Sequence, residues 1–264
     1  MAADLPVLAG VLREQRRSLV LWAVALAAVT LLYVGIYPSM GAADLQSVID
    51  SMPEGLVTAL GYDQIGTPGG YLSSTVYGLL GPVLLLVFAV GTGARLIAGQ
   101  EEDGTLELEL SAPVSRARVY RERLLALWLD AALLVGVVTL TTSALVLALD
   151  IDVALVNVLA GSTGLLLLVL GFATLALAVG AATGRRATAL AVAAGLAVAA
   201  FMLDAIGPTV DAGWMTAVSP FSWFLGADPL LEGFDLSSLL LLAAVPVSTG
   251  VVGLMAFARR DLMV

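Results

Sequence analysis

Mostly apolar stretches of about 20 residues or more recur six times along the chain, and shorter connections between them hold most of the charges and prolines. An α-helix rises 1.5 Å per residue, so about 20 residues cross the roughly 30 Å hydrocarbon core of a bilayer. The third and fourth connections are very short, which makes spans three, four and five sequential antiparallel neighbours. The pattern predicts an all-α integral membrane protein with six transmembrane helices near residues 18–37, 72–94, 124–149, 153–183, 187–206 and 236–258.

The basic residues indicate which ends of the predicted spans face the cytoplasm. All twelve are arginines, and all lie between or beside the predicted spans on the same side of the six-span layout. Positive residues near span ends mark the cytoplasmic side of a membrane protein. We therefore expect a multi-pass protein of the cell membrane with both termini in the cytoplasm. The arginines are Arg13, Arg16, Arg17, Arg95, Arg116, Arg118, Arg121, Arg123, Arg185, Arg186, Arg259 and Arg260.

The opposite side is purely acidic. The predicted outer connections contain eleven acidic residues and no basic residue, in a chain of net charge −9 that lacks lysine. Dense carboxylates keep water at a surface, and high salt screens their mutual repulsion. The composition therefore favours a halophilic source. These acidic residues are Asp44, Asp50, Glu54, Asp63, Asp150, Asp152, Asp204, Asp211, Asp228, Glu232 and Asp235.

Composition also restricts the chemistry. With 60% hydrophobic and 12% charged residues, little sequence remains for a separate soluble domain, so residues 1–264 are interpreted as a single transmembrane domain. The chain has no cysteine and no histidine, which excludes disulfides, thiolate catalysis, imidazole metal sites and any histidine base. Without lysine it also has no phosphate-binding loop of the Walker type. We expect no catalytic, metal-binding or cofactor-binding residue, and no nucleic-acid partner.

Two segments are predicted to lie along the membrane surface instead of crossing it. Residues 7–17 place an apolar face beside a charged one, which is typical of an interfacial helix on the inner leaflet. Residues 207–235 are half apolar and are interrupted by Pro208, Pro220 and Pro229. Because aromatic side chains concentrate at membrane interfaces, this segment predicts one or two short helices dipping into the outer leaflet. An ordinary loop with aromatics resting on the surface is an equal alternative.

The connection between spans two and three, residues 95–123, is the only long cytoplasmic one. It contains the run E-E-D-G-T-L-E-L-E-L-S-A-P-V-S-R, from Glu101 to Arg116. Its Leu–Glu alternation has the period of a strand, but a lone strand would leave both edges unpaired. A short helix that ends at Pro113 is therefore favoured, with Ser115 capping the next helix. From charge alone, a solvated loop is the favoured interpretation.

This run resembles the signature between the second and third helices of the type-two export permeases of ATP-binding-cassette (ABC) transporters. Weaker resemblances follow in the same order at residues 219–230 and 257–262. The resemblance covers essentially the whole chain. It implies a non-catalytic permease subunit that dimerises in membrane lipid, with a second copy or another permease. It also implies two copies of a separate ABC ATPase, which hold the ATP and Mg²⁺, and export of a substrate through a pathway at the dimer interface.

In that family the run forms a coupling helix in a groove of the ATPase, so that closing of the ATPase pair tilts spans two and three. Glu109 departs from the family pattern, because it adds a charge to a run that is usually more apolar. This leaves open which helix face docks. The resemblance implies a smaller second contact at Gly184, Arg185 and Arg186. It assigns the coupling role to Glu101, Glu102, Gly104, Thr105, Glu107, Leu108, Ser111, Pro113 and Arg116.

Three other functions are compatible with parts of the pattern. A membrane anchor or assembly factor would use the same ATPase contact without a continuous pathway. An ion-coupled secondary carrier needs buried acids near mid-membrane, where the chain offers Asp130. We expect Asp130 to pair with an arginine at the inner boundary instead. An intramembrane aspartate protease needs two neighbouring acids, and Asp130 and Asp204 lie near opposite membrane faces. A pathway of alanine, leucine and valine does not identify a substrate.

Overall fold

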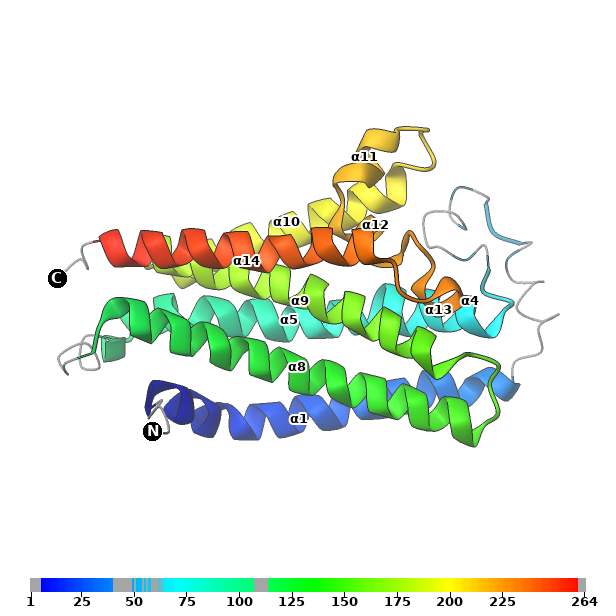
Figure 1. Ribbon diagram of the computed structural model, residues 1–264, viewed down its shortest axis with the longest axis horizontal. Coiled ribbons are helices and arrows are strands. Elements are labelled where there is room, and N and C mark those ends of the chain that lie inside the picture. The colour runs from blue at the N-terminus through cyan, green and yellow to red at the C-terminus, as the bar shows by residue number, and fades with distance from the viewer. Residues whose placement is uncertain are drawn as a thin grey trace.

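The computed structural model describes residues 6–39, 49, 51–53, 55, 57, 62, 64–106 and 114–260, and within these residues there is no strand. Six helical segments of the described chain are long and apolar enough to cross a membrane, in the predicted order. Five of them are single helices: α1 (Pro6–Ile36), α8 (Arg116–Ala148), α9 (Leu155–Thr183), α10 (Arg186–Ile206) and α14 (Leu236–Arg259) (Figure 1). A short 3-10 turn, η1 (Tyr37–Ser39), follows α1.

The second span is a composite of five consecutive helical pieces. A π-helix bonds each residue to the fifth one before it, and such segments are frequent at functional sites. Here two π-helical pieces flank α5, and the inner one leads directly into the predicted coupling run. The pieces are α4 (Pro68–Leu72), η2 (Ser73–Leu80), α5 (Gly81–Ala94), η3 (Arg95–Gly99) and α6 (Gln100–Glu102).

Several helices extend beyond the apolar stretches that predict them. α1 begins at Pro6, so the interfacial helix predicted over residues 7–17 is not a separate element but the first turns of α1. α8 begins at Arg116, and the hydroxyl of Ser115 accepts a hydrogen bond of 3.3 Å from the N–H of Arg118. This confirms the predicted cap. A helix continues past the apolar core while its residues favour helix and its end is capped, which hydropathy alone does not detect.

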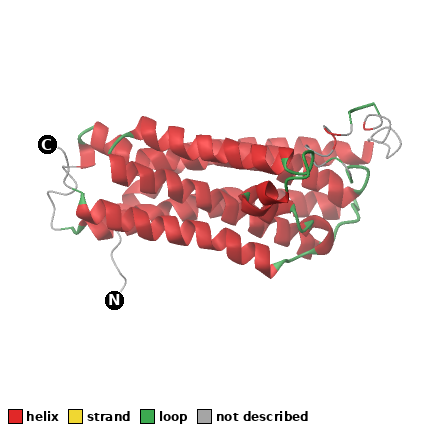
Figure 2. Cartoon of the chain, turned by 90° about the horizontal axis from the view of Figure 1, so that it is seen from above, coloured by secondary structure: helices red, strands yellow, loops and turns green. Residues whose placement is uncertain are grey.

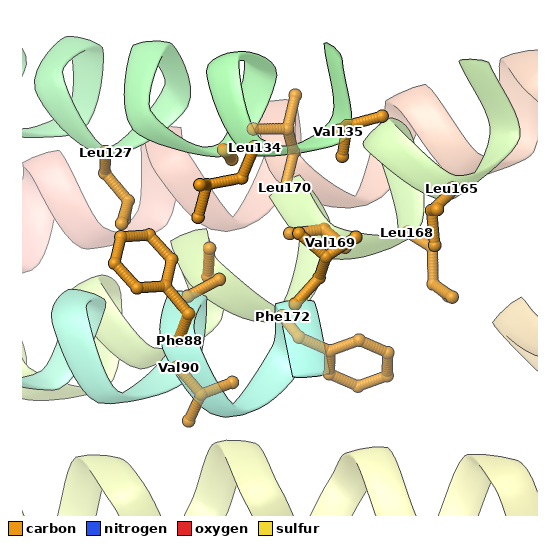
Figure 3. Close-up of a cluster of buried hydrophobic side chains, with 14 of the residues drawn as sticks. Phe88, Val90, Leu127, Leu134, Val135, Leu165, Leu168, Val169, Leu170 and Phe172 are labelled. Atoms are coloured by element: carbon orange, nitrogen blue, oxygen red, sulfur yellow. The ribbon is translucent and has the colours of Figure 1, made fainter. Parts of the chain in front are cut away.

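α9 lies at the centre of the bundle. In its most apolar window 72% of the residues are buried, against 17% in α10. α5, α8, α10 and α14 all pack on α9, while α1 packs mainly on α8 (Figure 1, Figure 2). Spans three, four and five are therefore neighbours, as predicted. Figure 3 shows one part of the core, where Phe88 of α5, Leu127 of α8 and Val169 of α9 gather.

Small residues bring the helices around α9 into close contact. A Cβ atom added at Gly93 of α5 would lie 2.5 Å from the carbonyl oxygen of Ala173 on α9. On the other side, Gly253 of α14 lies directly against Ala178 of α9 and the hydroxyl of Tyr120 on α8. Membrane helices associate through such close backbone approach, because lipid provides no hydrophobic drive between them.

Three short helices precede the last span: α11 (Gly213–Val218), α12 (Pro220–Leu225) and α13 (Pro229–Glu232). The segment thus forms short helices, as predicted, but three of them instead of one or two. Phe221 and Phe224 of α12 are buried, and the Phe221 ring centroid lies 5.5 Å from that of Phe201 on α10. Trp214 of α11 is 63% exposed. The alternative of a loop with its aromatics on the surface is thus wrong for α12.

The two ends of the bundle differ in charge. In Figure 1 the N- and C-terminal ends lie at the left, together with the helix ends that carry the arginines. α4, α11, α12 and α13 lie at the right, near connections whose described charges are all acidic. We name the arginine-bearing end the inner end and the other the outer end.

Candidate functional site

The predicted coupling run starts as a direct continuation of the second span. α6 ends at Glu102, and the chain then turns through Asp103 and Gly104, where the N–H of Gly104 donates to the carbonyl of Glu101 at 3.1 Å. Gly104 has a φ of 70°, in the left-handed region that favours glycine. A Cβ there would meet no atom within 4 Å, so the turn lies in open space. Thr105 is also exposed, which makes residues 103–105 an accessible tip.

Part of the predicted site lies outside the described residues. This holds for Glu107, Leu108, Ser111 and Pro113, and with them for the predicted short helix that ends at Pro113. The described part of the run consists of Glu101 to Leu106 before that gap and Val114 to Arg116 after it.

Glu101 faces into the protein instead of toward solvent. Its carboxylate forms an ion pair with the guanidinium of Arg260, directly after α14, and the two side chains are only 16% and 18% exposed. The other carboxylate oxygen, Oε2, is buried and has no hydrogen-bond partner in the described part of the chain. Arg260 also donates from Nη1 to the carbonyl oxygen of Ala181 on α9, at 2.9 Å. A single arginine therefore links the second span to α9 and α14.

Gly184 provides the space for this ion pair. It ends α9 in the left-handed conformation, with a φ of 66°, and its N–H donates to the carbonyl of Gly180 at 2.8 Å. A Cβ at Gly184 would lie 2.6 Å from Nη2 of Arg260 and 2.7 Å from Oε1 of Glu101. The backbone conformation therefore favours glycine here, and any larger residue would displace the ends of the two charged side chains.

Arg116 adds the start of α8 to the same cluster. Its Nη1 donates to the backbone carbonyl oxygen of Arg260. The ends of spans two, three, four and six are thus connected by side chains at one place. We name this cluster the inner joint and define it as Glu101, Arg116, Ala181, Gly184 and Arg260.

The second predicted contact lies beside the first. Oε1 of Glu102 accepts a hydrogen bond of 2.8 Å from the backbone N–H of Arg186, the first residue of α10. The first N–H groups of a helix have no partner within it and carry positive partial charge, so a carboxylate stabilises them. Arg185 and Arg186 are exposed. The two segments predicted to contact a partner therefore form one continuous surface at the inner end.

Sequence reasoning missed the role of Arg260. It used this residue only to orient the chain and as part of the weak resemblance at residues 257–262. The sequence does carry a signal, since the run at Glu101 and the segment at Arg260 are both parts of the resemblance. Their contact could not be read from spacing, because the two residues are 159 positions apart.

Asp130 does not form the predicted pair with an arginine. It is 1% exposed within α8, and its Oδ2 has no hydrogen-bond partner in the described ranges. Asp204, near the outer end of α10, accepts a hydrogen bond from the hydroxyl of Ser222. Asp130 lies near the middle of α8, whereas Asp204 lies near the end of α10.

Two hollows accompany the site. A groove of about 410 Å³ lies between the second span and α10, and its lining is apolar, with Val83, Val87, Ala194 and Val198 among the residues that form it. A polar cavity of about 320 Å³ lies at the inner end between α1 and the second span. Glu14, Gln15, Arg95, Gln100, Asp103 and Thr105 line this cavity.

Comparison with known proteins gives the family. A model of the ABC-2 family transporter proteins matches residues 7–262, which include every residue of the inner joint. The search of curated proteins finds no match. Permeases of this family are membrane components of ABC transporters and normally pair with an ABC ATPase subunit. Since the match covers nearly all of the 264 residues, the chain belongs to the ABC-2 transporter family.

Proposed function

We propose that this protein is the membrane-spanning permease subunit of an ATP-driven ABC exporter. A separate ATPase subunit binds ATP and Mg²⁺, and the permease converts the closing of two ATPase copies into movement of its spans. The observation that carries the proposal is the attachment of the coupling run to the bundle. The accessible tip at residues 103–105 continues from the second span, and the inner joint connects it to α8, α9 and α14.

The proposed ATPase surface combines the two predicted segments. Gly104, Thr105, Arg185 and Arg186 offer accessible positions on the described part of this surface, and the contact of Glu102 with α10 holds the two segments together. Glu107, Leu108, Ser111 and Pro113 complete the proposed coupling run. In this arrangement Glu101 and Arg116 hold the run in place through their contacts with Arg260. The partner ATPase therefore meets one surface that is linked to five spans.

The orientation follows from charge. We infer that the inner end faces the cytoplasm, since the arginines lie there and positive residues near span ends stay on the cytoplasmic side. ATP is cytoplasmic, so the ATPase surface and the arginines must share a side. The first turns of α1, with Arg13, Arg16 and Arg17 exposed, would lie near the inner leaflet's headgroups.

The proposed pathway lies between two permease copies. α10 is the least buried of the six spans, and the apolar groove beside it is open along the outside of the bundle. A second copy that covers this face would enclose the groove and form a route across the membrane. The proposal therefore includes a dimer.

A tagged copy of the chain, purified in mild detergent at high salt, tests this function. We expect an ABC ATPase to co-purify, identified by mass spectrometry, and the assembly to hydrolyse ATP with sensitivity to vanadate. The variant Asp103→Arg with Thr105→Arg should reduce ATPase retention by about tenfold or more, as for central interface residues. Thr209→Arg with Asp211→Arg changes the same residue types at the outer end and should leave retention unchanged.

Two outcomes would contradict the proposal. One is transport by the purified chain that needs no ATPase, which is the behaviour of an ion-coupled carrier. The other is full ATPase retention in the inner-end double variant, which would place the contact elsewhere. Retention of an ATPase whose activity never responds to any candidate substrate, and without transport in vesicles, would favour a membrane anchor.

A further inference from the structure

Arg260 lies at the inner end, and its contacts join parts of the chain that are far apart in sequence. It contacts the carboxylate of Glu101 and donates to Ala181, and its own carbonyl oxygen accepts from Arg116. Its neighbour Arg259, by contrast, is exposed. One arginine of the pair is therefore built into the bundle, while the other remains at the surface.

The guanidinium of Arg260 is held in place by the residues around it. The guanidinium lies against Gly184, where any side chain would displace it. The ion pair is mostly shielded from water, so its two charges attract more strongly than an exposed pair would. Removing one partner would leave the other charge buried and uncompensated, which is costly. The pair therefore resists local opening.

The carboxylate of Glu101 is engaged within the protein. Oε1 faces Arg260, and Oε2 is buried, so no oxygen of this carboxylate is left for a partner protein. The same is not true of Asp103, two residues later, which is exposed at the tip. Glu101 thus makes an internal contact, while the exposed residues of the tip are the ones available to a partner protein.

We propose that Arg260 is the positioning residue of the coupling run. Through Glu101 it makes the tip, the start of α8, the turn between α9 and α10 and the end of α14 move as one rigid body. The inference rests on the proposed function, in which the tip receives the movement of the ATPase. It adds that the force does not pass only along spans two and three, but enters α9 and α14 directly at Arg260.

This arrangement has a mechanical consequence. α14 packs along α9, the central helix, and α9 in turn contacts α5, α8 and α10. A displacement delivered to Arg260 therefore reaches α9 and α14 directly and α5, α8 and α10 through α9. If the ion pair is broken, the described contacts that still hold the run include the bond of Glu102 to α10, the hydrogen bond from Arg123 to Gln100 and the burial of Leu106, but the link through Arg260 to α9 and α14 is lost. The ATPase would then still bind, but its movement would be taken up by the loosened tip.

The absence of cysteine permits a direct test, because two introduced cysteines are then the only thiols in the chain. Spin labels at Thr105→Cys and Ala258→Cys, both exposed positions, report the distance between the tip and the end of α14. We expect a narrow distance distribution in the otherwise unchanged protein, purified without an ATPase and without nucleotide. In Glu101→Gln and in Arg260→Gln the distribution should broaden. Asp103→Asn and Arg259→Gln are the matched controls and should leave it narrow.

The functional readout separates positioning from binding. In the assembly with its ATPase, Glu101→Gln and Arg260→Gln should retain the ATPase at the level of the unchanged protein. The stimulation of the bound ATPase by these permease variants should fall by about 3- to 30-fold, the range for loss of a coupling contact. The double variant Glu101→Arg with Arg260→Glu restores opposite charges and should recover much of this activity.

A variant that fails to fold is replaced by a conservative one. Glu101→Asp and Arg260→Lys keep the charges but lose reach, and they should broaden the distribution less than the glutamine variants do. An unchanged, narrow distribution in all pair-breaking variants would overturn the inference. The label experiment needs no ATPase, so its outcome stands apart from the proposed function, which fails if the unchanged protein binds no ATPase.

Discussion

The carboxylate of Glu102 accepts a hydrogen bond of 2.8 Å from the backbone N–H of Arg186 and so caps a helix that starts 84 residues later in the chain. An acidic side chain at this place satisfies an otherwise unpaired donor and lies at the positive end of the α10 dipole. The two segments that the sequence predicts as separate partner contacts are thus joined by a single bond.

This bond predicts a loss of stability in Glu102→Ala. Removal of a capping side chain costs about 1 kcal/mol, and the effect should be confined to the inner end of α10. Thermal unfolding in detergent should show a lower midpoint for Glu102→Ala than for Asp103→Ala, which removes an exposed acid from the neighbouring position. Equal midpoints for the two variants would mean that the cap contributes nothing measurable.

The glycines at 104 and 184 form a matched pair for a second prediction. Both have positive φ angles, of 70° and 66°, so alanine strains the backbone similarly at each, by about 1 to 2 kcal/mol. Only Gly184 has the Arg260–Glu101 ion pair against it. Gly184→Ala should therefore destabilise by about 2 to 4 kcal/mol, clearly more than Gly104→Ala.

Unfolding midpoints of the two glycine variants check this difference. Gly136→Ala is the control, since it lies within α8 and its added Cβ would meet no atom within 4 Å. It should be neutral or slightly stabilising, because alanine favours helix over glycine. A Gly184→Ala variant no less stable than Gly104→Ala would show that the ion pair moves aside without cost.

A third prediction concerns pH and the start of α14. Hydrogen bonds from Ser238 and Ser237 to the carboxylate of Asp235 lower the pKa of this group from 3.8 to about 2. A carboxyl with a lowered pKa stabilises the folded state at pH values above its unfolded pKa. This contribution is lost as the pH falls from about 4 toward 2.

Comparison with Asp235→Asn isolates this effect, since asparagine also caps helices but does not titrate. The difference in unfolding midpoint between the two proteins should be constant above about pH 5 and should change progressively below about pH 4. A difference independent of pH down to about pH 2 would contradict the assignment.

Salt should stabilise the outer end. Asp150, Asp152, Asp211, Asp228 and Glu232 are exposed there. Desolvation, and after it the charge of Glu232, raises the pKa of Asp228, so these two acids repel each other. We expect the unfolding midpoint to rise between about 0.1 M and 3 M KCl, because the Debye length falls from about 10 Å to below 3 Å.

The triple variant Asp150→Asn, Asp152→Asn and Asp211→Asn should need less salt for the same midpoint. Replacement of three exposed arginines by glutamine at the inner end is the charge-matched comparison, and it should not reduce the salt requirement. A protein that stays folded and monodisperse at low salt would count against a halophilic source.

Local pattern predicts most of the fold, because each span is set by its own apolar run. The number and order of the spans and the cap at Ser115 follow from neighbouring residues alone. Helix ends are less accurate, since hydropathy marks the apolar core and not the polar turns that continue α1 and α8 past it. The burial of Phe221 and the exposure of Trp214 also depend on where α12 and α11 pack, which composition does not reveal.

The site was predictable only in part, for a similar reason. The resemblance identifies the run at Glu101 and the segment at Gly184, and the structure brings these two together. The contact of Glu101 with Arg260 depends on the phase of α14 where it passes α9. A shift of one residue would present Arg259 in place of Arg260, and the two are indistinguishable by residue type.

The central place of α9 also determines when the bundle can close during biosynthesis. α9 is the fourth span to emerge, but one of its packing partners, α14, is the last. Until α14 is inserted, the side of α9 that receives Gly253 lacks this packing partner. A chain truncated before residue 236 would therefore have an incompletely packed core and should be degraded by membrane proteases.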